Sequence, residues 1–291
     1  MTDFSVSVKV WWGGMTLVSL VNLSLWTASW LRQRRREADL SGALSRYRLW
    51  QCWMSGVYVL GCASRSFVIR GDVRRFSMID HWFSSVLIGR TIATIAEVCF
   101  VVQWALLLHL LGTRAESQGA RRLSWSLVPI IVIAECCSWF GVVTTNYLGN
   151  AVEESLWALT AMLTLVGFAL CYKNVSVPYR RFLNVGFTSG VCYILFMITV
   201  DIPTYLSRWR ADELAGKTYL TLGEGLVDIQ RYVVTGRYED WQYDMVWMSL
   251  YFSVAVWISL ALTLWPFQEN RAERDRTPDH HSGRTDAHLE P

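Results

Sequence analysis

The chain has 291 residues, of which 53% are hydrophobic, and it carries a net charge of +3. The hydrophobic share exceeds the roughly 45 to 50% usual in soluble domains, and the apolar residues come in long blocks. A soluble globular fold is therefore excluded, and nothing in the composition indicates a nucleic acid as partner. The pattern indicates a polytopic membrane protein whose partners are membrane lipids.

Seven apolar stretches follow one another along the chain. In chain order they cover residues 10–31, 49–67, 82–111, 123–144, 152–172, 182–206 and 244–267. Each is near or above the roughly 20 residues needed to cross a bilayer core. The sequence therefore predicts an all-α fold, a bundle of seven transmembrane helices within residues 1–267. The polar remainder, residues 268–291, has no apolar periodicity and is predicted to be a disordered cytoplasmic tail.

Basic residues are distributed unequally between the two sides of the predicted bundle. Sixteen lie in the tail and in the loops after the first, third and fifth stretches, and nine lie on the other side. Because Lys and Arg favour the cytoplasmic side, the N-terminus is predicted outside and the C-terminus in the cytoplasm. We expect a multi-pass protein of the cell membrane, while the sequence leaves the oligomeric state open.

Two segments outside the predicted spans show amphipathic or basic patterns. Within the extracytoplasmic segment 207–243, helical spacing over 212–234 joins four apolar residues: Leu222, Leu226, Ile229 and Val233. We expect it to lie along the outer surface, as a structural covering or as a lid over an opening in the bundle. Segment 68–81 carries arginines that either hold lipid phosphates or are ordinary interfacial residues: Arg70, Arg74 and Arg75.

Ionisable groups inside the spans are the main functional signal, because an unpaired charge in hydrocarbon costs several kcal/mol. Arg90, Thr94 and Glu97 are spaced four and then three residues apart, so they share one helical stripe that should face the bundle interior. Seven residues rise about 10.5 Å, which predicts that Arg90 and Glu97 do not pair directly. Thr94, water or another helix should lie between them.

Other spans carry charged groups at similar depth. Because neighbouring spans run in opposite directions, these groups should converge in the outer half of the bundle: Arg65, Glu135, Glu153, Glu154 and Asp201, with Asp80, His81 and Asp244 at the mouth. Pro203 cannot donate to the carbonyl of Thr199, so the sixth span should kink beside Asp201. Broken backbone next to an acid is typical of a cavity wall.

Two interpretations of these groups stay open. Five acids against two arginines favour a hydrated cavity in which some acids are protonated, at the solvent boundary or bound to a cation. The alternative is a structural network that fixes helix register, with Arg65 and Arg90 neutralised by the acids.

Several chemistries are excluded by what the spans lack. The lysines are Lys9, Lys173 and Lys217, none in the seventh span, so no retinal Schiff base is expected. Neither a Glu-x-x-His motif nor a Cys/His metal spacing occurs, so a di-iron carboxylate site and a cysteine-based zinc site are not expected. The seven cysteines fall within spans and are interpreted as core residues, and the tail histidines (His280, His281 and His288) as solvated.

Three hypotheses for function follow. The first is an enzyme that acts on a lipid or lipid-linked substrate, with catalytic acids that also form a tentative site for a divalent cation such as Mg²⁺ or Mn²⁺: Glu97, Glu135 and Asp201. Its substrate headgroup would be bound by Arg65, Arg90 and His81. The second is a proton-coupled transporter that uses the same acids as a relay. The third is a structural, sensor or assembly protein in which the polar network only stabilises the bundle.

Overall fold

The computed structural model describes residues 4–36 and 42–265. The predicted tail over 268–291 and its three histidines lie outside these ranges. In chain order the helices are α1 (Val6–Arg36), α2 (Ala43–Phe67), α3 (Val86–Arg114), α4 (Gln118–Thr144), α5 (Tyr147–Tyr172), α6 (Val177–Phe196), α7 (Ile202–Leu214), α8 (Leu222–Asp228), α9 (Tyr238–Leu250) and α10 (Val256–Leu264). The π-helical segment η3 (Met197–Asp201) joins α6 to α7, and η4 (Tyr251–Ala255) joins α9 to α10.

Six helical segments among the described residues are long and apolar enough to cross a membrane. They are α1, α3, α4, α5, the continuous α6–η3–α7 helix and the continuous α9–η4–α10 helix. This supports a multi-pass membrane protein. The predicted second span, α2, is 25 residues long but is not among the six. Its inward face carries buried polar groups such as Gln51, Ser55 and Ser66, which lower its hydropathy.

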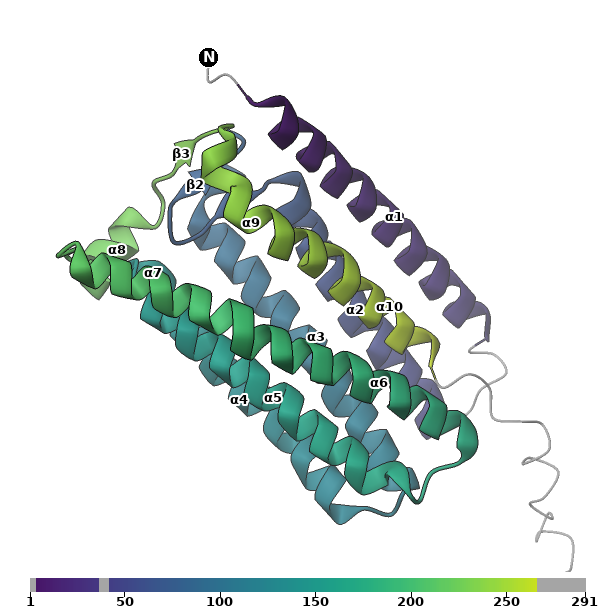
Figure 1. The fold of residues 1–291 in the computed structure, drawn as a ribbon. Helices are drawn as coiled ribbons and strands as arrows, with labels where there is room; N and C mark the ends of the chain where they lie inside the picture. Colours follow the sequence, from purple (N-terminus) through teal and green to yellow (C-terminus); the bar gives the residue numbers. More distant parts are fainter. Residues whose placement is uncertain (1–3, 37–41, 266–291) are drawn as a thin grey trace, which may run out of the picture.

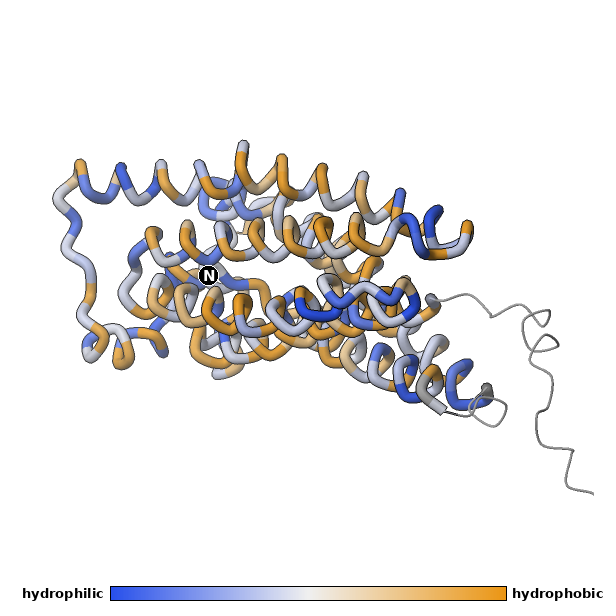
Figure 2. The backbone as a smooth tube through the Cα atoms, turned by 90° about the horizontal axis from the view of Figure 1, so that it is seen from below, coloured by the Kyte–Doolittle hydropathy of each residue, from blue (hydrophilic) through white to orange (hydrophobic). Residues whose placement is uncertain are grey.

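The long helices lie roughly side by side, and the small sheet marks one end of the bundle (Figure 1). We call this the sheet end and the opposite end the tail end. Apolar residues run along the helices, while hydrophilic ones gather mostly toward the ends of the bundle (Figure 2). This distribution fits a bundle whose middle is surrounded by hydrocarbon.

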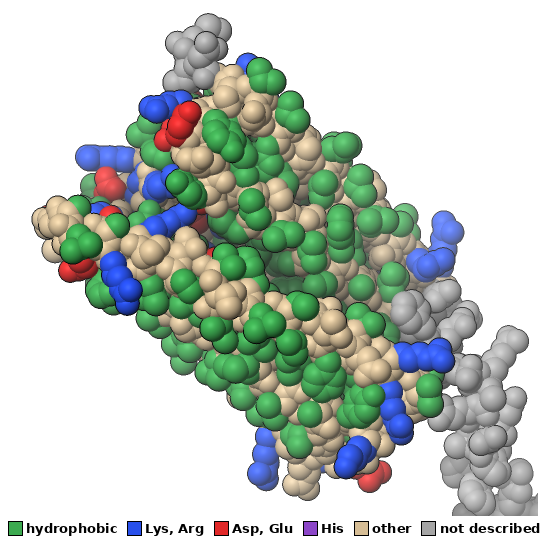
Figure 3. Space-filling view, in the orientation of Figure 1, with side chains coloured by type: hydrophobic (Ala, Val, Ile, Leu, Met, Phe, Trp, Pro, Cys, Tyr) green, Lys and Arg blue, Asp and Glu red, His purple; other side chains and the backbone are tan. Residues whose placement is uncertain are grey.

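Two groups of helices leave a hollow between them. The α6–η3–α7 helix packs against α5, whereas the α9–η4–α10 helix packs against α1, α2 and α3. Figure 3 shows the surface hollowed between these two helices, and we call this the lateral hollow. At the tail end Trp265 closes it, stacking on Phe182 at 4.5 Å between ring centroids and meeting Tyr179 edge-on at 4.9 Å.

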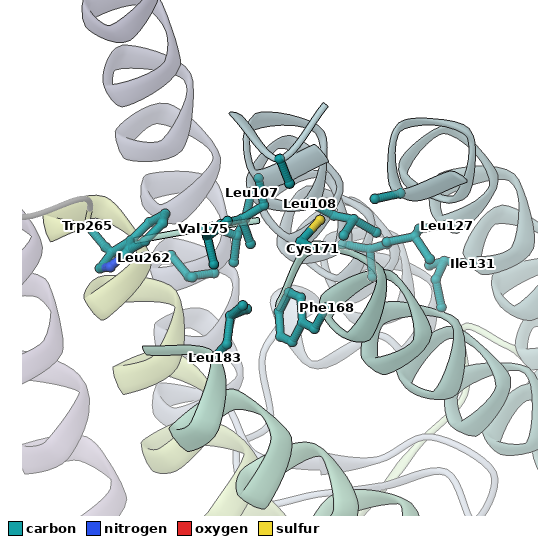
Figure 4. Close-up of a cluster of buried hydrophobic side chains, with 14 of the residues drawn as sticks. Leu107, Leu108, Leu127, Ile131, Phe168, Cys171, Val175, Leu183, Leu262 and Trp265 are labelled. Atoms are coloured by element: carbon teal, nitrogen blue, oxygen red, sulfur yellow. The ribbon is translucent and has the colours of Figure 1, made fainter. Parts of the chain in front are cut away.

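One cluster of buried apolar side chains lies toward the tail end. Figure 4 shows Leu107 and Leu108 of α3 together with Phe168 of α5, Leu183 of α6 and Trp265 after α10. All five are nearly or fully buried. A second apolar cluster at the sheet end surrounds Trp241. The polar site described below lies in the sheet half, between α3, α4 and α5.

The sixth predicted span is longer than expected and is interrupted near the predicted place. The continuous helix runs from 177 to 214, beyond the predicted end at 206, and Pro203 stands at the start of α7. Just before it, η3 widens the helix, and the Ile202 N–H donates to the Met197 carbonyl instead of keeping the α-helical spacing. A π-helical segment is therefore how the chain accommodates the proline.

The sheet end differs from its prediction. Strands β1 (Arg70–Gly71) and β2 (Phe76–Ser77) pair antiparallel, and β3 (Val233–Val234) pairs with β2 in parallel. The helical pattern predicted over 212–234 was wrong in extent, because Gly216 at φ +67° ends α7 and a Thr221–Glu224 capping box starts the short α8. Ile229 is buried, but Leu222 and Leu226 are exposed.

The cysteines also depart in part from the core role expected of them. Cys52, Cys62 and Cys171 are buried, whereas Cys136 and Cys192 are exposed on helix surfaces. All seven are free thiols.

Candidate functional site: carboxylates around Arg90

Three helices deliver four charged side chains to one buried place. α3 contributes Arg90 and Glu97, α4 contributes Glu135 and α5 contributes Glu153. Their exposed fractions are only 6, 6, 2 and 4%, respectively. We call these four residues the Arg90 cluster. Buried charges at this depth are expected only where they pair or carry function.

One nitrogen of Arg90 holds the cluster together. Arg90 Nη2 lies 3.2 Å from Glu97 Oε2, 2.6 Å from Glu135 Oε2 and 2.9 Å from Glu153 Oε1. The prediction that Arg90 and Glu97 do not pair directly was therefore wrong. Helical side chains lean toward the N-terminus, so Glu97 reaches back while the long arginine extends forward, and together they span the seven-residue rise.

Neutral donors surround the carboxylates. Thr94 donates its hydroxyl to Glu135 Oε2 at 2.6 Å, and the Trp139 indole donates to Thr94 Oγ1 at 3.0 Å. On the side of the lateral hollow, the Tyr251 hydroxyl donates to Glu97 Oε1 at 2.9 Å. Asn150 donates its amide to Glu153 Oε2 at 3.1 Å. Each carboxylate is thus oriented by a second helix or by its own helix, as a preorganised site requires.

The cluster has more acceptors than its arginine can satisfy. Nη2 carries two hydrogens, yet three carboxylate oxygens lie within 3.2 Å of it. Meanwhile Arg90 Nε and Glu135 Oε1 are buried with no partner among the described residues. With all three acids ionised the cluster would carry a charge of −2. In a low-dielectric interior this imbalance favours a bound proton or cation.

A close crossing of α4 and α5 sets the position of two of the acids. A Cβ added to Gly149 would lie 2.6 Å from the backbone of Gly141 and from the Cys137 carbonyl oxygen. Glycine is required where two helix backbones approach this closely. Because Glu135 and Glu153 stand near this crossing, any separation of the two helices would open the cluster.

A hard cation would find oxygen ligands here. One oxygen each from Glu97, Glu135 and Glu153 lies within 4.8 Å of the others. Carboxylate oxygens suit Mg²⁺ or Mn²⁺. However, Arg90 Nη2 already lies within hydrogen-bond distance of all three, so a cation would compete with a positive charge for the same oxygens. A shared proton fits this geometry better than a divalent ion.

Three of the residues predicted for the site lie apart from the Arg90 cluster. Arg65 forms an ion pair with Asp72 at 3.2 Å. His81 is exposed and accepts a hydrogen bond from the Phe83 N–H at the start of a short 3-10 helix. Asp201 is half-buried at the end of η3, where its electrostatic neighbours are Glu154 and Arg208. The five intramembrane acids therefore fall into two groups. Glu97, Glu135 and Glu153 belong to the Arg90 cluster, whereas Glu154 and Asp201 lie outside it.

The three arginines of segment 68–81 are engaged within the protein. Arg74 pairs with Asp244, and Arg75 pairs with Asp228 at 3.3 Å. Arg70 donates to the carbonyl of Phe83 at 2.7 Å, and burial together with the nearby Arg65 lowers its pKa to about 10. These contacts tie the sheet to the bundle and leave the three side chains poorly placed to hold lipid phosphates.

Sequence reasoning gave Glu153 no catalytic or binding role and gave none to its neutral partners. Glu153 was recognised as an intramembrane acid, but nothing in the sequence distinguishes it from Glu154, which is half-exposed. Tyr251 reads as an ordinary interior tyrosine, and only the packing of η4 brings its hydroxyl to Glu97. Asn150 stands three residues before Glu153 but also four before Glu154, so helical spacing does not single out either acid.

A second polar cluster lies between α2, α3 and α10. Gln51 Nε2 donates to the Gln103 carbonyl at 2.8 Å, and Gln103 Nε2 donates to Gln51 Oε1 at 3.1 Å. Ser259 Oγ lies 2.6 Å from Gln103 Oε1 and 3.0 Å from Ser55 Oγ. We call these four residues the glutamine cluster. All are fully buried, and none of their side-chain atoms lacks a partner.

Comparison with known proteins gives no relative from which a function could be transferred. No protein-family model, no curated protein and no solved structure matches the chain. The function therefore has to be argued from the site alone.

Proposed function

We propose that this chain is a seven-helix protein of the cell membrane that uses the Arg90 cluster for acid–base chemistry on a lipid or lipid-linked substrate. The observation that carries the proposal is the geometry of one guanidinium nitrogen facing three buried carboxylates. Such a group is expensive to bury, and a purely structural ion pair needs one acid, not three.

The excess of carboxylates supplies the proton that the chemistry needs. Glu97 and Glu135 flank the same arginine nitrogen, so charge balance favours one of them as a neutral acid beside an ionised partner. A carboxylic acid next to a carboxylate provides both a general acid and a general base. Arg90 would stabilise negative charge that develops on the substrate. Glu153, held by Asn150, keeps Arg90 oriented.

Substrate access from the membrane is consistent with the lateral hollow. Tyr251 belongs to the helix that borders this hollow, and its hydroxyl bonds to Glu97. A lipid that enters between α6 and α10 would therefore approach the cluster without crossing water. This favours an apolar or lipid-linked substrate over a soluble one.

The seven-span topology with the sheet end outside belongs to the same proposal. α2 packs between α1 and α3 and matches the other helices in length, which favours a seventh crossing. Cysteine labelling with an impermeant reagent tests it. Gly223 has open space around it and Lys173 is exposed, so both positions accept a cysteine that the reagent can reach. Gly223→Cys should be labelled in intact cells and Lys173→Cys only after permeabilisation; the reverse pattern contradicts the orientation.

The decisive experiment for catalysis is the substitution Glu97→Gln. Water or the other acids can compensate the charge, but an amide cannot act as a base. We expect a folded protein whose thermal midpoint is nearly unchanged and whose activity falls by about 10²-fold or more. Activity is measured as rescue of a strain lacking the protein, and folding by thermal unfolding in detergent. Glu239→Gln, an exposed acid of α9, is the matched control and should keep both.

Two results would contradict the proposal. A Glu97→Gln protein that unfolds or fails to accumulate, together with Glu135→Gln behaving alike, would assign the cluster a structural role. Full rescue by Glu97→Gln would remove it from catalysis. Metal analysis of the purified protein completes the test. A stoichiometric divalent ion that both variants lose would show that the acids bind a cation and do not share a proton.

A proton-coupled carrier is the second candidate. It is favoured by the two π-helical segments, η3 and η4, which lie in the helices on either side of the lateral hollow. Such segments concentrate at functional sites and permit helix rearrangement. Proton-dependent uptake into vesicles that contain the purified protein, lost in Glu97→Gln, would favour the carrier over the enzyme.

A further inference from the structure

At the sheet end, the mouth of the lateral hollow carries an arginine that is surrounded by three tyrosine rings. Arg208 of α7 lies with its guanidinium carbon 5.7 Å from the ring centroid of Tyr147, 5.9 Å from that of Tyr205 and 6.0 Å from that of Tyr243. These tyrosines come from α5, α7 and α9, so Arg208 lies where the two sides of the hollow approach each other. It is half-buried.

Arg208 differs from the arginines to which headgroup binding was first assigned. Arg65 is paired with Asp72, and Arg90 is shared by three acids. Among residues 4–36 and 42–265, no carboxylate lies within ion-pair distance of Arg208. Asp201 acts on it only from a greater distance. An arginine framed by aromatic rings and lacking an acid is suited to an external anion.

The rest of the hollow is suited to a hydrocarbon chain. The helix α6–η3–α7 is scarcely buried within the protein. On the helix face that carries Phe182, its exposed apolar side chains include Val185 and Tyr193. The hollow ends in the aromatic contact of Trp265 with Phe182. A cationic mouth beside an apolar hollow that is closed at its far end matches an amphiphile with an anionic head.

We propose that the lateral hollow binds one anionic phospholipid, whose phosphate pairs with Arg208 and whose acyl chain runs along α6 toward Trp265. This inference names the substrate class of the Arg90 cluster, and in that respect it rests on the proposed function. The phosphate would accept hydrogen bonds from the guanidinium and from the hydroxyls of Tyr205 and Tyr243. Asp201 and Glu154, about two helical turns deeper, would then face the region that links the headgroup to the chain.

Lipid binding to the purified full-length protein tests the proposal directly. Phosphatidylglycerol and phosphatidylcholine are added separately in detergent, and bound lipid is counted by native mass spectrometry. The wild-type protein should retain one phosphatidylglycerol in clear preference to phosphatidylcholine. Arg208→Gln should weaken phosphatidylglycerol binding about tenfold or more, and Arg208→Lys should weaken it less, because lysine keeps the charge but not the bidentate geometry.

A matched control separates the site from general attraction to anionic lipid. Arg210→Gln removes the same charge from an exposed position two residues away and should change the affinity less than about twofold. Equal losses in the two variants, or no preference between the lipids, would overturn the site. Tyr243→Ala, an exposed position at the mouth, gives a second variant with an expected loss if Arg208→Gln does not fold. Unchanged binding in it would also overturn the site.

Two further arms identify the ligand and separate this inference from the proposed function. Millimolar inorganic phosphate should not displace the lipid; displacement would show that a free anion suffices and would overturn the lipid assignment. Glu97→Gln should bind phosphatidylglycerol as the wild type does. If Glu97→Gln is inactive but lipid binding does not depend on Arg208, only the lipid site is rejected. If lipid binding depends on Arg208 but Glu97→Gln is fully active, only the catalytic proposal is rejected.

Discussion

The bundle contains two buried polar clusters that differ in how completely their hydrogen-bonding groups are paired. In the glutamine cluster, Gln51 and Gln103 exchange amide hydrogen bonds and Ser259 completes the set, so every side-chain polar atom has a partner. In the Arg90 cluster, three acids compete for one nitrogen while Arg90 Nε and Glu135 Oε1 have no partner among the described residues.

This difference separates stability from function. A neutral network in which donors and acceptors match stabilises and specifies helix packing without needing anything from outside. A charged network with surplus acceptors is an incomplete arrangement that a proton, cation or substrate can complete. We therefore expect variants in the glutamine cluster to lose activity only in proportion to lost folding. Variants in the Arg90 cluster should lose activity while the protein stays folded.

The largest effect is expected from removing the central charge of the Arg90 cluster. Arg90→Met should lower the free energy of unfolding by about 3–5 kcal/mol, because three buried acids lose the cation with which all three pair. Acidic pH should restore part of that loss, since protonation removes the uncompensated charge. Unfolding monitored by circular dichroism at two pH values measures both. A variant as stable as the wild type at neutral pH would mean that the acids are already neutral.

A smaller effect, on folding alone, is expected in the glutamine cluster. Gln103→Leu leaves Gln51 Oε1 without its donor and should cost about 1–3 kcal/mol. Activity per folded molecule should stay at the wild-type level, as determined by rescue normalised to the amount of folded protein. Loss of activity in fully folded Gln103→Leu protein would erase the contrast between the two clusters.

The smallest effect should come from the link between the Arg90 cluster and the lateral hollow. Tyr251→Phe removes one hydrogen bond to Glu97 and should reduce the free energy of unfolding by about 0.5–1.5 kcal/mol. Because it frees a carboxylate oxygen at the catalytic acid, activity should fall more than stability predicts. Tyr238→Phe is the matched control, since Tyr238 belongs to the same continuous helix as Tyr251 but is exposed and lies outside the Arg90 cluster. Equal behaviour of the two variants would argue against a role for Tyr251.

Hydrophobic patterning determined much of this molecule from the sequence. Long apolar runs have to form helices in hydrocarbon because every backbone polar group needs an internal partner. Each predicted span accordingly overlaps a helix, although every start is off by about one helical turn or more and the sixth span ends at 214 instead of 206. The spacing of Arg90, Thr94 and Glu97 placed one polar stripe inward, and the proline at 203 marked the interruption of α6–α7.

Only the tertiary structure decided which charges meet. Arg65 and Arg90 look equivalent in the sequence, yet one pairs with a loop aspartate and the other gathers three acids. Glu153 and Glu154 are adjacent, but helix rotation turns the first into the cluster and the second toward Asp201. Side-chain direction depends on how neighbouring helices rotate and cross, here through the contact of Gly141 with Gly149, and periodicity along one chain segment carries no information about that.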